Sequence, residues 1–243
     1  MNKLFVADLS RAIKNKTLWL CFAIMFLIGL VLALKIPAET PSDVAMFACA
    51  FFVGIPCAVF CSLFTGTQYS EGTLRNKLVV GHKRHNIYLA LLSVNGVTSF
   101  VIASGYMLAV LLVGIFRLAP FQNAFFDLAF YLLAIFLIIN LYAVIYTTLC
   151  MLISGKATSS VICCLLSFAL LILGNHISVR VDDSIGVTKG IYLFLFNILP
   201  SCQGLQLIGL SGTIPRHLIG YSLAVSVVIA VIGAICFRRK ELK

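Results

Sequence analysis

Six long apolar runs divide this chain of 243 residues, and they constrain its fold more than any other feature. A helix needs roughly 20 apolar residues to cross the hydrocarbon core of a bilayer. The runs span residues 17–35, 43–64, 87–116, 126–152, 160–178 and 217–237. We therefore predict an all-α polytopic membrane protein with six transmembrane helices. The third and fourth runs are so long that their helices must tilt or project from the bilayer.

The small share of charged residues supports the same class of protein. Hydrophobic residues make up 61% of the chain and charged residues 11%, whereas an ordinary soluble domain is about half apolar and a quarter charged. So few charges cannot cover a soluble surface. The connections between the runs are too short for a soluble domain, so residues 1–243 are interpreted as one transmembrane domain.

The distribution of Lys and Arg predicts the orientation. With the N-terminus in the cytoplasm, thirteen of the eighteen Lys and Arg residues fall on the inner side, as the positive-inside rule requires. Six spans then place both termini in the cytoplasm, including the basic tail at 238–243. The net charge of +10 could otherwise suggest nucleic acid, but no aromatic-basic module is present. We expect contact with anionic membrane lipid and no nucleic-acid partner.

Residues 1–16 precede the first run and have the pattern of an amphipathic helix. The apolar side of that helix contains Phe5, Val6, Leu9, Ala12 and Ile13. The opposite side contains Lys3, Ser10, Arg11 and Lys14. Basic residues on the wet side predict a helix that lies in the inner membrane interface. The alternative is a frayed, charged N-terminus.

The segment YSEGTLRNKLVVGHKR, residues 69–84, connects the second and third runs on the inner side. Ser70 can cap a helix N-terminus, and Glu71 would then lie in its first turn, where the helix dipole favours an anion. Gly81 suits the position that ends such a helix. These signals predict a cytoplasmic helix of about ten residues, or about 15 Å.

The same short helix would have an apolar edge. Leu74 and Leu78 fall one turn apart on one face, whereas Arg75 and Lys77 point elsewhere. A loop that only connects two spans does not require such a face. Both interpretations, a docking helix and a plain cytoplasmic loop, remain open at this point.

The connection at 179–216 is expected on the outer side and contains an apolar stretch too short to span the membrane. Pro200 interrupts this stretch and Gly204 follows. Irregular backbone at membrane depth is stable only where protein buries it or where it lines a cavity. We predict a pair of re-entrant helices before the sixth span, with a hydrophobic loop on the outer surface as the alternative.

Few residues in the chain are placed to carry out chemistry. The interiors of the six runs contain no Asp, Glu, Lys or Arg, which argues against an ion-coupled carrier and an intramembrane protease. His82 and His85 are spaced to approach a metal, but solvated loop histidines are commoner, so no metal site is predicted. His176 is interpreted as interfacial. Only Cys202 of the nine cysteines lies in an expected outer segment, which leaves no outer disulfide pair.

The stretch SGKATS superficially resembles a phosphate-binding loop. The full pattern requires a glycine where Cys150 stands and a hydroxyl residue where Ala157 stands. We therefore expect no ATP site, no cofactor and no catalytic residue in this chain. If the protein transports a substrate, the energy must come from a partner.

A few polar residues interrupt the apolar spans. They are Asn95, Thr98, Asn140, Thr147 and Thr148. Such residues commonly hydrogen-bond between transmembrane helices. The alternative is that some of them line an apolar, aromatic cavity for a hydrophobic or amphipathic substrate.

These features together resemble one known family. The chain combines an inner amphipathic helix, six spans, the segment YSEGTLRNKLVVGHKRxxIYLA, a re-entrant segment before the last span and the basic tail FRRKELK. This resembles the type-2 export permeases of ATP-binding-cassette transporters over essentially the whole chain. The segment Glu71–Arg84 is the most specific part of the resemblance.

The resemblance implies roles for particular residues. In that family, the segment after the second span is a coupling helix that sits in a groove of a separate ATPase subunit. The matching positions here are Glu71, Gly72, Thr73, Arg75, Asn76, Lys77, Gly81 and Arg84. Spans two and five of two permease copies line the family's substrate path, which implicates Phe51, Phe52, Phe60, Phe64 and Phe168.

The resemblance also implies a function in the plasma membrane of a bacterium. The chain would export a peptide, an antimicrobial compound or a lipid-like molecule by alternating access. ATP and Mg would bind to the separate ATPase subunit, and a second permease copy, identical or a sister, would complete the path. The main alternative is a membrane sensor or immunity protein that binds a toxic peptide without transporting it. A lipid-modifying enzyme is disfavoured because no polar catalytic cluster is present.

Overall fold

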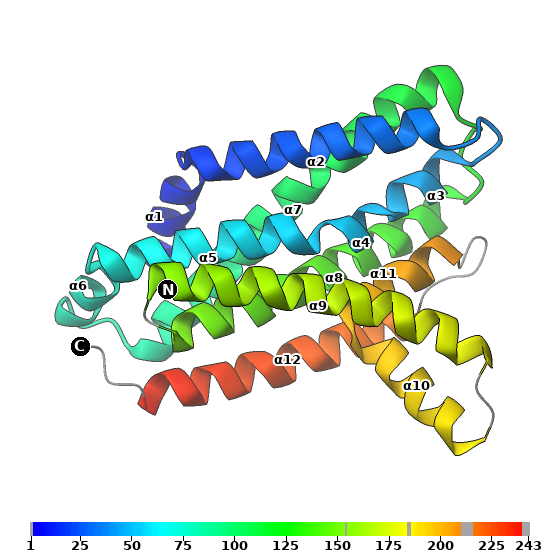
Figure 1. Cartoon of the computed structure of the whole chain (residues 1–243). Coiled ribbons are helices and arrows are strands. Elements are labelled where there is room, and N and C mark those ends of the chain that lie inside the picture. The colour runs from blue at the N-terminus through cyan, green and yellow to red at the C-terminus, as the bar shows by residue number, and fades with distance from the viewer. Residues whose placement is uncertain (1, 154, 184–185, 210–215, 240–243) are drawn as a thin grey trace.

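Helices make up almost all of the structure. The computed structural model describes residues 2–153, 155–183, 186–209 and 216–239, and no β-strand occurs in these ranges. Five long helices lie lengthwise beside one another in one bundle (Figure 1). They are α2 (Lys16–Lys35), α7 (Arg84–Arg117), α8 (Phe125–Leu152), α9 (Lys156–Asp183) and α12 (Arg216–Arg239).

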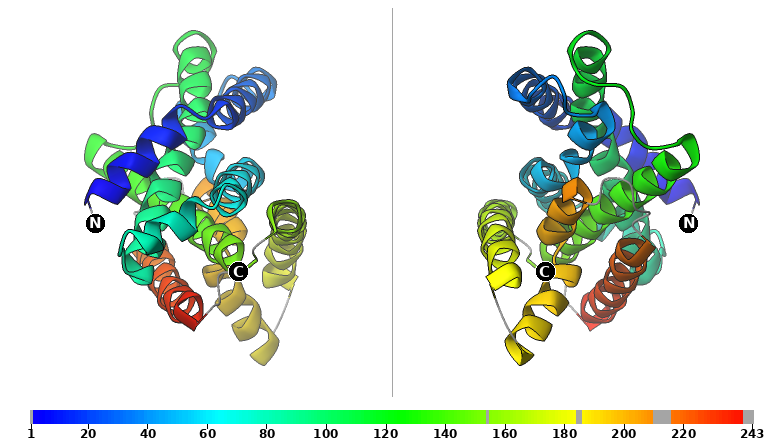
Figure 2. Two further views of the ribbon diagram at one scale, coloured as in Figure 1. Left: turned by 90° about the vertical axis from the view of Figure 1, so that its left-hand side faces the viewer. Right: turned by 90° about the vertical axis from the view of Figure 1, so that its right-hand side faces the viewer.

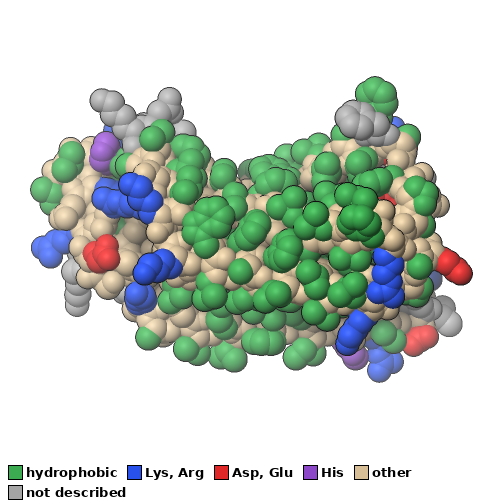
Figure 3. Space-filling model, turned by 90° about the horizontal axis from the view of Figure 1, so that it is seen from above, with side chains coloured by type: hydrophobic (Ala, Val, Ile, Leu, Met, Phe, Trp, Pro, Cys, Tyr) green, Lys and Arg blue, Asp and Glu red, His purple; other side chains and the backbone are tan. Residues whose placement is uncertain are grey.

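The surface of the bundle has the character of a membrane protein. Each of the five long helices is apolar enough to cross a bilayer, and two bent helix pairs raise the number of candidate spans to as many as seven. Charged side chains gather at the two ends of the molecule, and hydrophobic side chains dominate the middle (Figure 3). The chain is thus an all-α polytopic membrane protein. Helix α7 has 34 residues, or about 50 Å, so it exceeds the bilayer core of about 30 Å as predicted.

The second predicted span is bent rather than straight. It consists of α3 (Ser42–Phe47), α4 (Cys49–Phe52) and α5 (Gly54–Ser70), with a bend of 44° before α5. Pro56 explains the break, because its ring would clash with the carbonyl of Phe52 in a continuous helix. Helix α5 also continues beyond the predicted end at residue 64, and this extension changes where the next helix begins.

Helices α2 and α7 pack backbone against backbone. A Cβ atom on Gly29 would lie 2.8 Å from the carbonyl oxygen of Tyr106, and one on Gly105 would lie 2.6 Å from that of Phe22. Neither distance is possible for a real side chain, so both positions require glycine. Small residues permit this close approach of helices in a membrane, where packing rather than water exclusion drives association.

Replacing Gly105 with Ile should separate α2 from α7. Overpacking of this kind costs about 1–3 kcal/mol of unfolding free energy, which should lower the midpoint of thermal unfolding in detergent. Gly220→Ile is the matched control, because Gly220 also lies in a helix but nothing lies within 4 Å of its added Cβ. Equal midpoints for the two variants would contradict the close packing.

The polar residues of the spans form contacts within the bundle. The side-chain amide of Asn95 on α7 donates to the Thr147 hydroxyl on α8 at 2.8 Å and to the Thr65 hydroxyl on α5 at 3.3 Å. The hydroxyls of Tyr88 and Thr148 are 2.8 Å apart. These bonds connect α5, α7 and α8, as predicted for polar residues that hold helices together.

Thr98 and Asn140 behave differently from the other polar residues of the spans. The Thr98 hydroxyl donates to the carbonyl of Val94 at 2.9 Å, and the Asn140 amide donates to that of Phe136 at 2.9 Å. Each bond lies within one helix. These two residues therefore satisfy their own polar groups without joining neighbouring helices through these bonds.

Two short helices precede the last long helix, as expected. α10 (Val187–Ile198) and α11 (Pro200–Gly209) meet at 94°, where Pro200 lacks the N–H that would continue α10. A Cβ on Gly204 would lie 3.0 Å from the backbone carbonyl carbon of Ala50. Helix α11 thus packs tightly into the bundle, whereas α10 projects from it (Figure 1). The described part of this segment is therefore helical and not an irregular loop.

The N-terminal helix α1 (Asn2–Ile13) runs across one end of the bundle (Figure 2). Leu4, Asp8 and Ala12 are four residues apart and form its buried stripe, whereas Val6 on the predicted apolar side is 62% exposed. The helix is therefore present, and the frayed alternative is wrong. The pattern did not predict that a carboxylate would lie in the buried stripe.

Candidate docking site at the end of the bundle

A short helix, α6 (Thr73–Val79), lies between α5 and α7 at the same end of the bundle as α1 and the last residues of α12 (Figure 1). Gly72 precedes it with φ of 66° and Gly81 follows it with φ of 95°. Both angles fall in the left-handed region that favours glycine. Two sharp reversals of the backbone therefore set this helix apart from its neighbours.

The end of α6 matches the sequence prediction. The N–H of Gly81 donates to the carbonyl of Leu78 at 2.9 Å, and the N–H of His82 donates to that of Lys77 at 3.1 Å. This pair of bonds is the Schellman motif, in which a left-handed glycine ends a helix. Gly81 thus has the predicted role.

The beginning of α6 differs from the prediction, and Ser70 is not its cap. Ser70 is the last residue of α5, and its hydroxyl donates to the carbonyl of Thr67 at 3.1 Å. Glu71 lies at the C-cap of α5 and not in the first turn of α6. Because α5 continues this far, the chain reverses only at Gly72, and α6 has seven residues rather than ten.

The two faces of α6 have opposite environments. Leu74 is buried and Leu78 is half-buried against the core, which confirms the predicted apolar edge. On the other side, Val79 is 80% exposed, and Arg75 is exposed as well. Val80, the residue after α6, is 76% exposed and lines a hollow together with Asp8 and Lys77. The end of α6 therefore presents two uncovered apolar side chains, one of them beside a cation.

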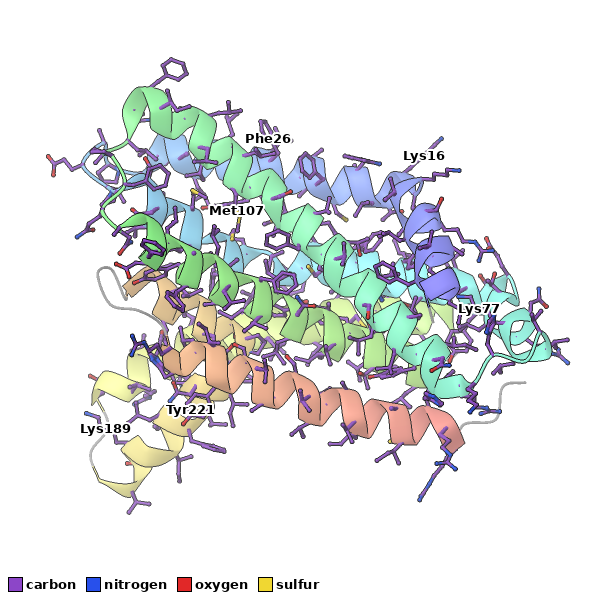
Figure 4. All side chains as sticks on the ribbon, turned by 180° about the vertical axis from the view of Figure 1, so that it is seen from behind. Lys16, Phe26, Lys77, Met107, Lys189 and Tyr221 are labelled. Carbon is purple, nitrogen blue, oxygen red and sulfur yellow. The ribbon has the colours of Figure 1, made fainter. Side chains whose placement is uncertain are left out.

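Lys77 faces the protein and not the solvent. Its ammonium group donates to both carboxylate oxygens of Asp8, at 2.8 and 2.7 Å, and to the side-chain oxygen of Gln68 at 2.9 Å. The Lys77 side chain is 10% exposed and that of Asp8 is 1% exposed. This contact joins α6 to α1 and to the end of α5. Lys77 is labelled in Figure 4.

Burial and the neighbouring Asp8 carboxylate shift the pKa of Lys77 in opposite directions. Burial lowers the pKa of the Lys77 ammonium, the hydrogen bonds and charge of Asp8 oppose that shift, and the nearby Arg11 lowers the pKa further. Lys77 is the cation that contacts the buried Asp8 carboxylate. Removal of one member of such a pair leaves an uncompensated buried charge.

Lys77→Met should leave the buried Asp8 carboxylate without a cationic partner. We expect this to lower the unfolding free energy by about 3–5 kcal/mol. The double variant Asp8→Leu, Lys77→Met removes both charges and should recover much of that loss. Arg75→Met is the matched control, since Arg75 is an exposed cation on the same helix. The midpoint of thermal unfolding in detergent is compared for the single, the double and the control variant. If the Lys77→Met protein were as stable as the Arg75→Met protein, the stabilising role of the Lys77–Asp8 ion pair would be contradicted.

The other residues of the expected coupling segment lie in two places, most of them around α6 and one beside α12. Glu71, Asn76 and Gly81 are exposed around α6, and Thr73 is half-buried. Arg84 lies at the start of α7, where its guanidinium donates to the backbone carbonyl of Arg238 on α12. The structure thus brings most of the predicted residues together around α6 but directs Arg84 toward α12.

A pocket of about 450 Å³ lies beside the start of α6. Its walls come from the end of α1, the end of α5 and the first residue of α6, and include Arg11, Gln68 and Thr73. The buried nitrogen Nε2 of Gln68 makes no hydrogen bond within the described residues. The base of α6 is therefore hollowed on the side that faces α1.

The phenylalanines implicated in the substrate path do not share one environment. Phe60 is fully buried and stacks on the buried Phe64, with ring centroids 5.5 Å apart. Phe51 and Phe52 are half-buried and meet edge to face, whereas Phe168 on α9 is 52% exposed. The rings of Phe60 and Phe64 therefore belong to the core of this chain in this conformation.

The described residues contain no group of three or more His, Cys, Asp or Glu that could hold a metal. His82 is half-buried and His85 is exposed. Sequence reasoning also missed Asp8, although a signal was present. Asp8 is the only acidic residue before Glu39, and a carboxylate that folding buries needs a charged or hydrogen-bonding partner.

Comparisons with known proteins add no homologue. A scan against protein-family models and a search of curated proteins found no match to this chain.

Proposed function

We propose that this chain is the permease subunit of an ATP-driven exporter, and that α6 is the helix on which a separate ATPase subunit acts. The observation that carries this proposal is the two-sided environment of α6. Its inner face is anchored by Leu74 and by the Lys77–Asp8 pair, its outer face presents Val79, and Val80 is exposed directly after the helix. A helix outside the spans with an anchored side and an uncovered apolar side is suited to receive a partner.

The proposed topology has six crossings. The five long helices and the bent segment α3–α5 would each cross once, and α10 and α11 would form a re-entrant pair on the opposite side from α6. This arrangement agrees with the two described chain ends lying at the same end of the bundle (Figure 1). The Lys and Arg distribution then assigns that end to the cytoplasm. The predicted tail beyond residue 239 lies outside the described residues.

The anchoring contacts support a mechanical role for α6. A force on α6 would pass to α1 and α5 through Lys77, and to α7 through the short turn after Gly81. Packed helices move as rigid units rather than deform continuously. ATP binding by the partner, with Mg, could in this way drive the bundle between inward-open and outward-open states.

An ion-coupled carrier is less well supported. Asp43 is a buried carboxylate near a span end, which could suggest an ion site. One of its oxygens accepts hydrogen bonds from the backbone N–H of Asn123 at 3.0 Å and from its side-chain amide at 2.6 Å. The other accepts from the N–H of Val44. Asp43 thus holds the connection between α7 and α8 and is not poised for transport.

The proposed substrate is hydrophobic or amphipathic, such as a peptide, an antimicrobial compound or a lipid-like molecule. The support is the apolar character of the spans, which offer exposed apolar side chains such as Phe168 and no charged group within their interiors. A second permease copy, identical or a sister, would complete the path.

The double variant Val79→Glu, Val80→Glu should abolish co-purification with the ATPase subunit and the transport it drives. Two carboxylates in an apolar groove would remain unpaired and desolvated. Val187→Glu is the matched control, because Val187 is 84% exposed but lies at the start of α10, at the other end of the bundle. The assay is pull-down from cells that co-express both subunits, followed by ATP hydrolysis in lipid nanodiscs.

Retained association by the Val79, Val80 variant would refute the docking role of α6. If the wild-type protein instead binds a peptide but never associates with an ATPase, the sensor or immunity function would replace the exporter function.

A further inference from the structure

A second pocket lies at the same end of the bundle, between the start of α7 and the end of α12. Its volume is about 640 Å³. The lining residues come from these two helices and the residue before α7, and they are Lys83, Arg84, His85, Ala234, Ile235 and Arg238. It shares no lining residue with the hollow beside α6.

The charge of this pocket is strongly positive. Lys83, Arg84 and Arg238 are basic residues, and no Asp or Glu is among the described lining residues. The Arg84 guanidinium donates to the backbone carbonyl of Arg238, so the two helices that form the walls are joined directly. Three cations within one concave site favour a compact anion such as a phosphate group.

The other wall of the pocket is apolar and continues along the membrane-facing side of α12. Ala234 and Ile235 line the pocket, and Ile235 is 52% exposed. Val231 and Ile232, one turn closer to the middle of the helix, are each 53% exposed. A ligand that fits both parts has an anionic head and a hydrocarbon chain.

We propose that this pocket binds the headgroup of an anionic phospholipid of the cytoplasmic leaflet. The phosphate would lie among Lys83, Arg84 and Arg238, and an acyl chain would follow Ile235 along α12. Basic pockets at the cytoplasmic ends of transmembrane helices are suited to such headgroups. The lipid would bridge α7 and α12, and this role does not depend on the function proposed for α6.

The test is native mass spectrometry of the full-length protein in a neutral detergent, titrated with phosphatidylglycerol or with phosphatidylcholine of the same acyl chains. The wild type should bind phosphatidylglycerol more tightly. The triple variant K83Q, R84Q, R238Q should lose affinity for it on the order of 100-fold with little change for phosphatidylcholine. Millimolar inorganic phosphate should not displace the lipid, because it lacks the acyl chain.

Two further variants make the result specific to the pocket. R11Q, K14Q, K16Q removes three exposed cations from the same end of the molecule and should retain the lipid preference. Ala234→Phe narrows the pocket without a change of charge and should weaken phosphatidylglycerol binding. Equal losses in both triple variants would overturn the proposal in favour of general charge attraction. Displacement by inorganic phosphate would overturn it in favour of a soluble anion site.

Discussion

The bilayer core offers no water to backbone N–H and C=O groups, and this constraint governs the whole structure. Each peptide group in a span must be satisfied inside a helix or against buried protein. The breaks in the structure obey this rule. The bend before α5 and the turn between α10 and α11 both occur at prolines, and both breaks face packed neighbours. Glycine-mediated contacts such as that of Gly105 with α2 then let the long helices approach closely.

Charged side chains gather at the two ends of the bundle, and at one end they organise the proposed docking site. The Lys77–Asp8 pair turns a cation of α6 inward and joins it to α1. An ion pair and a buried leucine hold one side of α6 against the bundle. A force on α6 would therefore be transmitted to the helices that it contacts. The exposed Val79 and Val80 at its end supply the apolar surface that a partner would cover.

Much of the fold follows from pattern alone, because long apolar runs and helix-ending glycines act locally. The long helices, the short helix after α5 and the stop at Gly81 were all predictable in this way. The Ser70 cap was wrong for a related reason. A serine favours a cap only where the preceding helix has already ended, and here α5 continues through Ser70 to the first residue that tolerates a left-handed backbone, Gly72.

The sequence by itself determined the membrane class, the α-helical architecture and the position of the segment between α5 and α7. Hydrophobicity and backbone propensity depend only on residues that are near one another in the chain. Only the tertiary structure decided which side chains of that segment face inward. Lys77 turns to the protein because α1 brings a buried carboxylate within 2.7 Å of it, and Phe60 and Phe64 enter the core because neighbouring helices cover them. Such partners lie far away in sequence, so no local pattern could identify them.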